Sequence, residues 1–239
     1  MKLVGERRAL SAVVFAFYAL IYSMIAVASL VPEFNKAFFA LATVYGLAFF
    51  SLVAGYFWAR WYSVGVGLYG VITAAVGMWQ IGAEPILVFV GGTHLAATLM
   101  LWGEAMSEHY DGQTAWREKL HMDEGAVQRL GRSVIRAGVS LPFVLLYALA
   151  PKPPGEGSYV LLALGALVLG VLGLRALVRL KTWGVMALGA AGGLMLIASM
   201  GEMASHADVF ALRPMLAGGL LVAAAAPWAA PAMRFIRAR

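Results

Sequence analysis

The sequence contains no cysteine. This absence excludes disulfide bonds, thiolate nucleophiles, cysteine-ligated iron–sulfur clusters and thiolate zinc sites. Charge is also scarce, because only 13% of the 239 residues are charged, whereas ordinary soluble domains carry about 25%. Hydrophobic residues make up 62% of the chain, and the mean hydropathy is +0.82. A soluble core of this length could not bury so much apolar surface, so the composition indicates a membrane protein.

Several catalytic signatures are missing as well. There is no Gly-Lys-Ser/Thr phosphate-binding loop, no Gly-x-Ser-x-Gly nucleophile elbow and no His-Glu-x-x-His zinc motif. Only His94 lies in the middle of an apolar run, so a haem would lack a second axial histidine inside the membrane. A retinal pigment needs a lysine within a late helix, and Lys181 lies at a helix boundary. No cofactor is predicted, although a divalent cation is considered below.

Long apolar runs dominate what is present. A helix needs about 20 apolar residues to cross the hydrocarbon core of a membrane. Eight such runs occur, at roughly 9–31, 37–58, 62–82, 85–104, 134–150, 158–178, 183–203 and 210–230. Transmembrane strands would instead show short segments of alternating polarity. The sequence therefore predicts an all-α, polytopic integral membrane protein with about eight transmembrane helices.

The lysines and arginines predict the orientation of these helices. If the N-terminus is cytoplasmic, the outer loops receive only Lys36, Lys152 and Arg213, and the inner side receives the other 15 of the 18 basic residues. This asymmetry follows the positive-inside rule and predicts cytoplasmic N- and C-termini in the inner membrane of a bacterium. The net charge of +6 is then explained by contact with anionic lipid headgroups, and no nucleic-acid partner is expected.

A shift of 121 residues aligns several features of the two halves. It superposes the following pairs: Arg8 with Arg129, Pro32 with Pro153, Arg60 with Lys181, and Val88 with Val209. We therefore expect a tandem, parallel repeat of two four-helix units, at 1–104 and 134–239, joined by a cytoplasmic linker at 105–133. The first helix begins like a signal peptide, with "KLVGERR" before an apolar run. We expect that this helix is not cleaved, because in the repeat it corresponds to the fifth helix, which is structural.

The linker lies in the one long polar stretch, residues 102–138, which holds half of the twelve acids and two of the four histidines. Its candidate site residues are Glu104, Glu108, His109, Asp111, His121 and Asp123. The simplest interpretation is an interfacial linker, in which Asp123 caps an amphipathic helix that lies at the headgroups and then turns into the membrane. The competing interpretation is a site for a divalent metal or for phosphate. Carboxylates and histidines are the side chains that bind divalent metals.

One segment of this linker, "EHYDGQTAWR", resembles part of the CDP-alcohol phosphotransferase signature. Asp111 and Gly112 match its central pair, and Glu108 stands for the acid that precedes them. The resemblance covers about twenty residues and implies a lipid-modifying enzyme that holds metal ions with four acids. The last two acids of the signature fall on Arg129 and Ser133, so half of the carboxylates are missing.

Two further groups of polar residues lie within or near the membrane helices. His94 falls near the middle of the fourth run, with Thr93, Thr98 and Gln80 as polar neighbours. An ionisable residue at that depth is a candidate for proton transfer or ligand binding, although it can also form a hydrogen bond between helices. Glu84, Glu202 and His206 are predicted to lie at the outer ends of helices, where they form a second polar cluster.

These features favour a non-enzymatic function. The second half has few polar groups within its last three helices, whereas a transporter with a central site usually carries polar groups in both halves. We therefore expect a subunit, scaffold or anchor that presents the cytoplasmic linker to a protein partner or to another copy of itself. The alternatives are a proton-coupled or small-solute transporter or channel that uses His94, and a lipid-modifying enzyme with carboxylates at the inner face.

Overall fold

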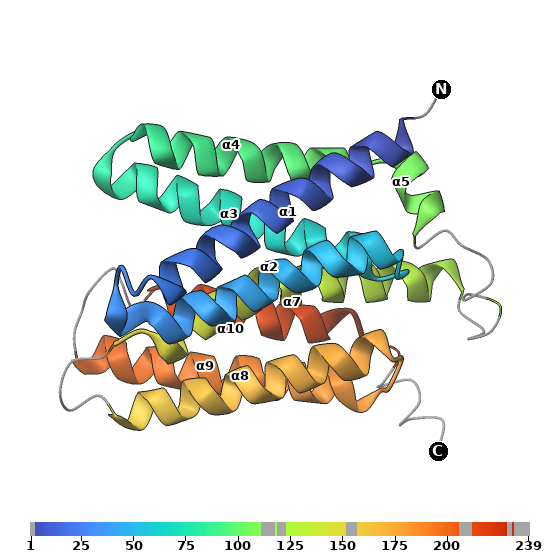
Figure 1. Ribbon diagram of the computed structural model, residues 1–239. Coiled ribbons are helices and arrows are strands. Elements are labelled where there is room, and N and C mark those ends of the chain that lie inside the picture. Colours follow the sequence, from blue (N-terminus) through green and yellow to red (C-terminus); the bar gives the residue numbers. More distant parts are fainter. Residues whose placement is uncertain are drawn as a thin grey trace, which may run out of the picture. The chain divides into compact units, whose positions relative to one another are not determined.

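The computed structural model describes residues 3–110, 118, 123–151, 157–205, 212–228 and 231. All regular structure in these residues is helical (Figure 1). The α-helices are α1 (Val4–Val27), α2 (Asn35–Ala54), α3 (Ala59–Ile81), α4 (Pro85–Met100), α5 (Glu104–His109), α7 (Glu124–Leu149), α8 (Gly157–Val178), α9 (Trp183–Ser205) and α10 (Leu212–Ala225). Short 3-10 turns precede α2 at Pro32–Phe34 and follow α10 at Ala226–Trp228. The predicted all-α class is confirmed.

Six of the described helices are long and apolar enough to cross a membrane. They are α1, α2, α3, α7, α8 and α9, so the chain is a multi-pass membrane protein. The predicted fourth and eighth spans are shorter apolar helices, with α4 containing 16 residues and α10 containing 14. At 1.5 Å per residue, a helix of that size covers roughly 21–24 Å, less than the ~30 Å hydrocarbon core. Helix α4 ends at Met100, and Gly103, which has a φ of 104°, lies between it and α5 as the N-cap of α5.

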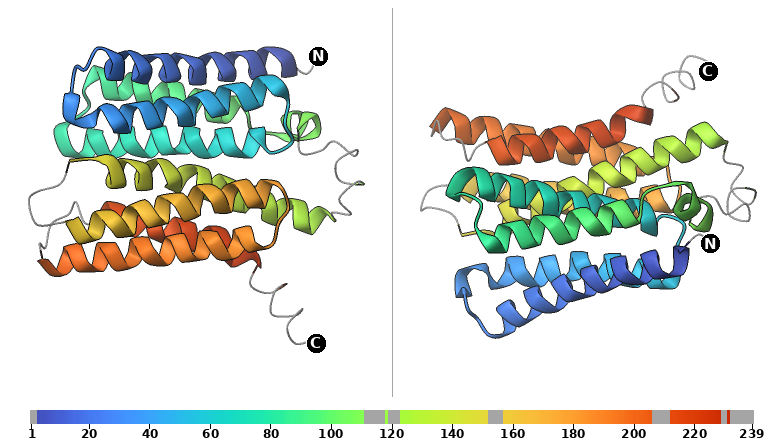
Figure 2. Two further views of the ribbon diagram at one scale, coloured as in Figure 1. Left: turned by 60° about the horizontal axis from the view of Figure 1, so that its bottom comes forward. Right: turned by 90° about the horizontal axis from the view of Figure 1, so that it is seen from above.

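The chain divides into two compact units, Met1–Asp123 and Glu124–Arg239. In the first unit α1 contacts α2 and α4, α2 contacts α3, and α3 contacts α4. In the second unit α7 contacts α8 and α10, α8 contacts α9, and α9 contacts α10. Each unit is thus a closed bundle in which three long helices and one shorter helix lie side by side (Figure 2). We call the end of each unit at which α1 or α7 begins its basic end.

The predicted linker at 105–133 is divided between the two units where it is described. Helix α5 contacts α1 in the first unit. Helix α7 begins at Glu124, directly after Asp123, and continues without interruption to Leu149. The expected amphipathic helix and the fifth membrane helix are therefore one continuous helix, and Val127, Leu130 and Val134 are buried in the bundle of the second unit.

Two helices end in the same hydrogen-bonded turn with different residues. After α2, Gly55 takes a φ of 73°, and the Tyr56 amide donates to the Ser51 carbonyl at 3.2 Å. After α8, Leu180 takes a φ of 59°, and the Lys181 amide donates to the Ala176 carbonyl at 2.9 Å. This left-handed position is normally occupied by glycine, so the leucine introduces strain at the end of α8.

Candidate functional site

His94 lies at the centre of the first unit with its side chain fully buried. Its Nδ1 lies 2.7 Å from the Val90 carbonyl oxygen, one turn earlier in α4. Because a carbonyl can only accept, Nδ1 must carry the proton. The Nε2 atom of the neutral ring is then an acceptor, and the Tyr45 hydroxyl of α2 donates to it at 2.7 Å. Both ring nitrogens therefore have hydrogen-bond partners.

Aromatic rings from two other helices enclose this imidazole. The ring centroid of Tyr18, on α1, lies 4.2 Å from that of His94, and the Tyr45 centroid lies 5.6 Å from it. Tyr22 extends the cluster, since its centroid is 5.4 Å from that of Tyr45. The Thr93 hydroxyl donates to the Phe89 carbonyl at 2.8 Å, so the Tyr18 hydroxyl, 2.7 Å away, donates to Thr93. The histidine and the tyrosines form one buried polar aromatic cluster.

Two glycines of α3 make room for the side chains of α4. A Cβ atom at Gly70 would overlap Cγ, Cδ2 and Nε2 of the His94 ring. A Cβ at Gly67 would overlap the Thr98 hydroxyl, which donates to the His94 carbonyl at 2.9 Å. Small residues allow membrane helices to pack closely. Here the two glycines leave the space that the His94 imidazole and the Thr98 hydroxyl occupy.

The structure does not bring Gln80 to this cluster. Gln80 lies ten residues beyond Gly70 on α3 and is exposed, and ten residues of helix span about 15 Å. Thr93 contacts the cluster through Tyr18 and does not bond to the imidazole. No aspartate or glutamate occurs anywhere in residues 34–83 or 85–103. In α1 the one acid is Glu6, in the first turn, and residues 7–32 hold none. No carboxylate is therefore placed near the middle of the first unit's helices, where the His94 ring could exchange a proton with it.

At the basic end of the first unit, two arginines donate hydrogen bonds to carbonyls at the ends of other helices. The Arg7 Nε donates to the Met100 carbonyl at 2.9 Å, and its Nη2 donates to the Trp102 carbonyl at the end of α4. Arg8 donates to the Val53 carbonyl at the end of α2. The last carbonyls of a helix have no partner within it and carry partial negative charge, so arginine stabilises these ends.

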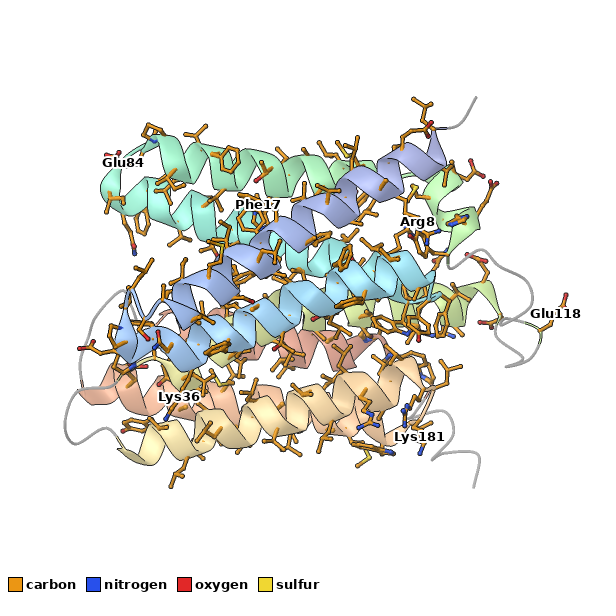
Figure 3. All side chains as sticks on the ribbon, in the orientation of Figure 1. Arg8, Phe17, Lys36, Glu84, Glu118 and Lys181 are labelled. Carbon is orange, nitrogen blue, oxygen red and sulfur yellow. The ribbon has the colours of Figure 1, made fainter. Side chains whose placement is uncertain are left out.

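Arg8 also connects this end to α5. Its Nη1 lies 3.1 Å from Nε2 of His109. Since arginine can only donate, His109 must accept through Nε2 and is neutral in this contact. Figure 3 shows Arg8 beside α5, with Lys36 and Glu84 at the opposite end of the unit.

Helix α5 is held to the bundle by two fully buried side chains. Met106 and Tyr110 are both 0% exposed, and the Tyr110 hydroxyl donates to the Leu52 carbonyl at 3.1 Å. Burial raises the pKa of this hydroxyl, and the positive charge of Arg8 opposes part of the rise. The hydroxyl therefore remains a donor at neutral pH. The exposed residues of the helix include Glu104, Glu108 and His109, three of the predicted linker candidates.

The second unit repeats one of these contacts. In the first unit Ser11, four residues after Arg7, donates to the Ala97 carbonyl of α4 at 3.3 Å. In the second unit Arg136 donates to the Ala223 carbonyl of α10, and Ser140, four residues later, donates to the Ala217 carbonyl at 2.7 Å. An Arg-x-x-x-Ser sequence on the first helix thus holds the fourth helix in both units. Sequence alignment at a shift of 121 misses it, because these pairs are 129 residues apart.

The aromatic cluster has no counterpart in the described part of the second unit. Where α9 packs on α10, a Cβ atom at Gly192 would overlap the Gly218 carbonyl and the backbone and side chain of Val222. The carboxylate of Glu202 accepts a hydrogen bond from the Tyr147 hydroxyl at 2.8 Å. Its predicted partner His206 lies outside the described residues, and Glu84 is an exposed residue directly before α4 in the other unit.

Within the residues that the structure describes, no three His, Asp or Glu side chains are grouped so as to hold a metal ion. Asp111 and His121 lie outside those residues, and Asp123 is exposed before α7. The phosphotransferase-like positions Arg129 and Ser133 have other contacts: the Arg129 guanidinium lies over the Trp228 ring, and Ser133 donates to the Ala224 carbonyl. No protein-family model matches the chain, and neither a curated protein nor a solved structure matches it.

Proposed function

We propose that this multi-pass membrane protein works by association, and that α5 with the linker that follows it is the surface that a partner protein binds. The observation that carries this proposal is the attachment of α5. Met106 and Tyr110 hold it to the bundle, while Glu104, Glu108 and His109 face solvent. A helix that is fixed in place and exposes polar groups loses little conformational freedom on binding, which favours affinity.

The charge of the linker indicates the kind of partner. Residues 104–124 contain six acids and two basic residues, a net charge of −4 (2 − 6), whereas the rest of the chain carries sixteen basic residues and six acids, or +10. The acidic part is therefore residues 104–124, because the full linker at 105–133, which includes Arg129 and Arg132, carries a net charge of only −1 (4 − 5). Complementary charge steers association and disfavours wrong partners, so a protein with a basic surface fits best.

The orientation belongs to the same proposal. The positive-inside asymmetry supports an orientation in which both basic ends, the termini and α5 face the cytoplasm of a bacterial cell. The matching Arg-x-x-x-Ser contacts in the two units support a tandem repeat of two four-helix bundles.

Native mass spectrometry after gentle extraction tests the proposal. The wild-type protein is compared with Glu104→Gln/Glu108→Gln and with a matched control, Glu33→Gln/Glu84→Gln, which removes two exposed acids at the opposite end. We expect a stoichiometric partner with the wild type and the control, and its loss from the α5 variant. A bare monomer in every case would contradict the proposal, as would a partner that all three proteins retain equally. A homo-oligomer lost only from the α5 variant would identify the partner as a second copy.

A second candidate function is proton or small-solute transport through His94. A fully buried imidazole bonded to a tyrosine hydroxyl is the observation that favours it. Two observations argue against transport. Both ring nitrogens already have hydrogen-bond partners, and no carboxylate is placed near the ring in the described part of the first unit. In proteoliposomes, a transporter would lose flux in His94→Gln while the protein remains folded. Equal proton permeability of wild-type, variant and protein-free liposomes would refute proton transport.

A further inference from the structure

One face of α8 combines an apolar stripe with two arginines at its basic end. Leu161, Val168 and Leu172 are 72%, 56% and 42% exposed. Arg175 and Arg179 continue the same face and are also exposed, with Arg179 directly after the last residue of the helix. Intervals of seven, four, three and four residues keep all five side chains on one side of a helix.

These two arginines differ from the others described at the basic ends. Most of the latter already have partners within the protein: Arg7, Arg8 and Arg136 donate to helix carbonyls, Arg132 donates to Gln128, and Arg129 lies over Trp228. The side chains of Arg175, Arg179 and Lys181 form no hydrogen bond or ion pair with the part of the chain that the structure describes. Figure 3 shows Lys181 at this end of α8.

We propose that this face of α8 binds one phospholipid with an anionic headgroup. Arg175 and Arg179 are four residues apart, about one helical turn, and the planar donors of a guanidinium group match the oxygens of a phosphate. Lys181 adds a third cation, and Trp183, 47% exposed at the start of α9, has the amphipathic ring typical of the headgroup level. The apolar stripe along the same face accommodates the acyl chains, which identifies a lipid and not free phosphate as the ligand.

The second helix of the first unit provides an internal comparison. Helix α2 also exposes an apolar face, with Leu47, Phe50 and Val53 at 46%, 68% and 51%. It ends at Ala54 and has no cation in its last turn. The cations near this end are already engaged, since Arg8 donates to the Val53 carbonyl and Arg60, at the start of α3, also has an interaction within the protein. The selectivity for anionic lipid therefore belongs to α8 and is not shared by the two units.

Lipid titration followed by native mass spectrometry tests this site. Phosphatidylglycerol or phosphatidylcholine is added to the delipidated full-length protein, and apparent dissociation constants are measured for wild type, Arg175→Gln/Arg179→Gln and the control Lys36→Gln. Lys36 is an exposed cation at the opposite end of the first unit. Each cation near an anionic surface contributes roughly fivefold, so the double variant should bind phosphatidylglycerol about 30-fold more weakly. The control and all phosphatidylcholine values should be unchanged.

Two results would overturn the proposal: equal affinity of the wild type for the two lipids, or undiminished binding of phosphatidylglycerol by the double variant. Competition by millimolar inorganic phosphate that removes the lipid preference would also overturn it, because the site would then bind phosphate alone. The single variant Arg179→Gln, beyond the last helical residue, gives the same test with about a fivefold effect if the double variant is unstable in detergent.

Discussion

Replacing Gly70 by alanine tests how the first unit is packed around His94. A Cβ atom at Gly70 would overlap three atoms of the imidazole ring. The ring cannot move aside without lengthening its 2.7 Å bond to Tyr45 or its 2.7 Å bond to Val90. The substitution therefore has to separate α3 from α4 or break one of these bonds.

The magnitude follows from three contributions. Overpacking a well-packed interior costs about 1–3 kcal/mol. Loss of the bond between His94 and Tyr45 adds about 0.6 kcal/mol, the average for such bonds between membrane helices, and at most about 1.7 kcal/mol. The better helix propensity of alanine returns about 1 kcal/mol. We expect Gly70→Ala to lower the free energy of unfolding by about 2 kcal/mol in total.

Equilibrium unfolding in mixed micelles, followed by tryptophan fluorescence, provides the measurement. Gly92→Ala, on α4, is the matched control, because no atom lies within 4 Å of the position that its Cβ would occupy. The control should be neutral or more stable by up to about 1 kcal/mol. If Gly70→Ala proves as stable as Gly92→Ala, the described packing of α3 against His94 is wrong. The double variant Gly70→Ala/His94→Ala should recover part of the loss, since the overlapping ring is removed.

Three smaller perturbations test the helix ends. Leu180→Gly should raise the unfolding free energy by about 1 kcal/mol, because leucine pays about 1–2 kcal/mol for its left-handed φ; thermal unfolding measures it. Tyr110→Phe should lower that free energy by about 0.5–1.5 kcal/mol through the lost bond to Leu52, and α5 should become more accessible to protease. His109→Lys replaces the acceptor of Arg8 with a cation, so α5 should again become accessible, whereas His109→Gln should protect it. Unchanged proteolysis of the Lys variant would contradict the proposed contact.

The membrane class was predictable because it depends on composition alone, whereas helix ends were not. The apolar run at 85–104 continues through Leu101 and Trp102, so hydropathy gives no sign that α4 stops at Met100. The break is visible only in the backbone, where the Trp102 amide bonds to the Leu99 carbonyl and Gly103 takes a φ of 104° before α5. Similarly, the polar composition of the linker suggested a separate segment, but the buried side chains of Met106 and Tyr110 attach its first turn to the bundle. The four-residue spacing of these two residues was the one feature of the sequence that could have indicated a buried helix face.

The candidate site was predictable as a residue but not as a cluster. His94 stands out because it is ionisable and lies in the middle of an apolar run. Its partner Tyr45 is 49 residues away in the sequence, and nothing in a tyrosine of an apolar run marks it as a hydrogen-bond donor to a particular histidine. Gln80 was expected nearby because it is polar, but the position of α3 that faces the imidazole is Gly70. A glycine indicates a close contact between two helices only when the partner helix is already known.

The proposed function depends on α5 as the surface that a partner binds, and photo-crosslinking in intact cells tests this most directly. A photoreactive amino acid is placed at Glu108, which is exposed on α5, and separately at Glu84, which is exposed at the opposite end of the first unit. We predict a discrete crosslink from position 108 to one protein with a basic surface, and none to that protein from position 84. If position 108 gives no protein crosslink, or if both positions give the same products, association through α5 is contradicted.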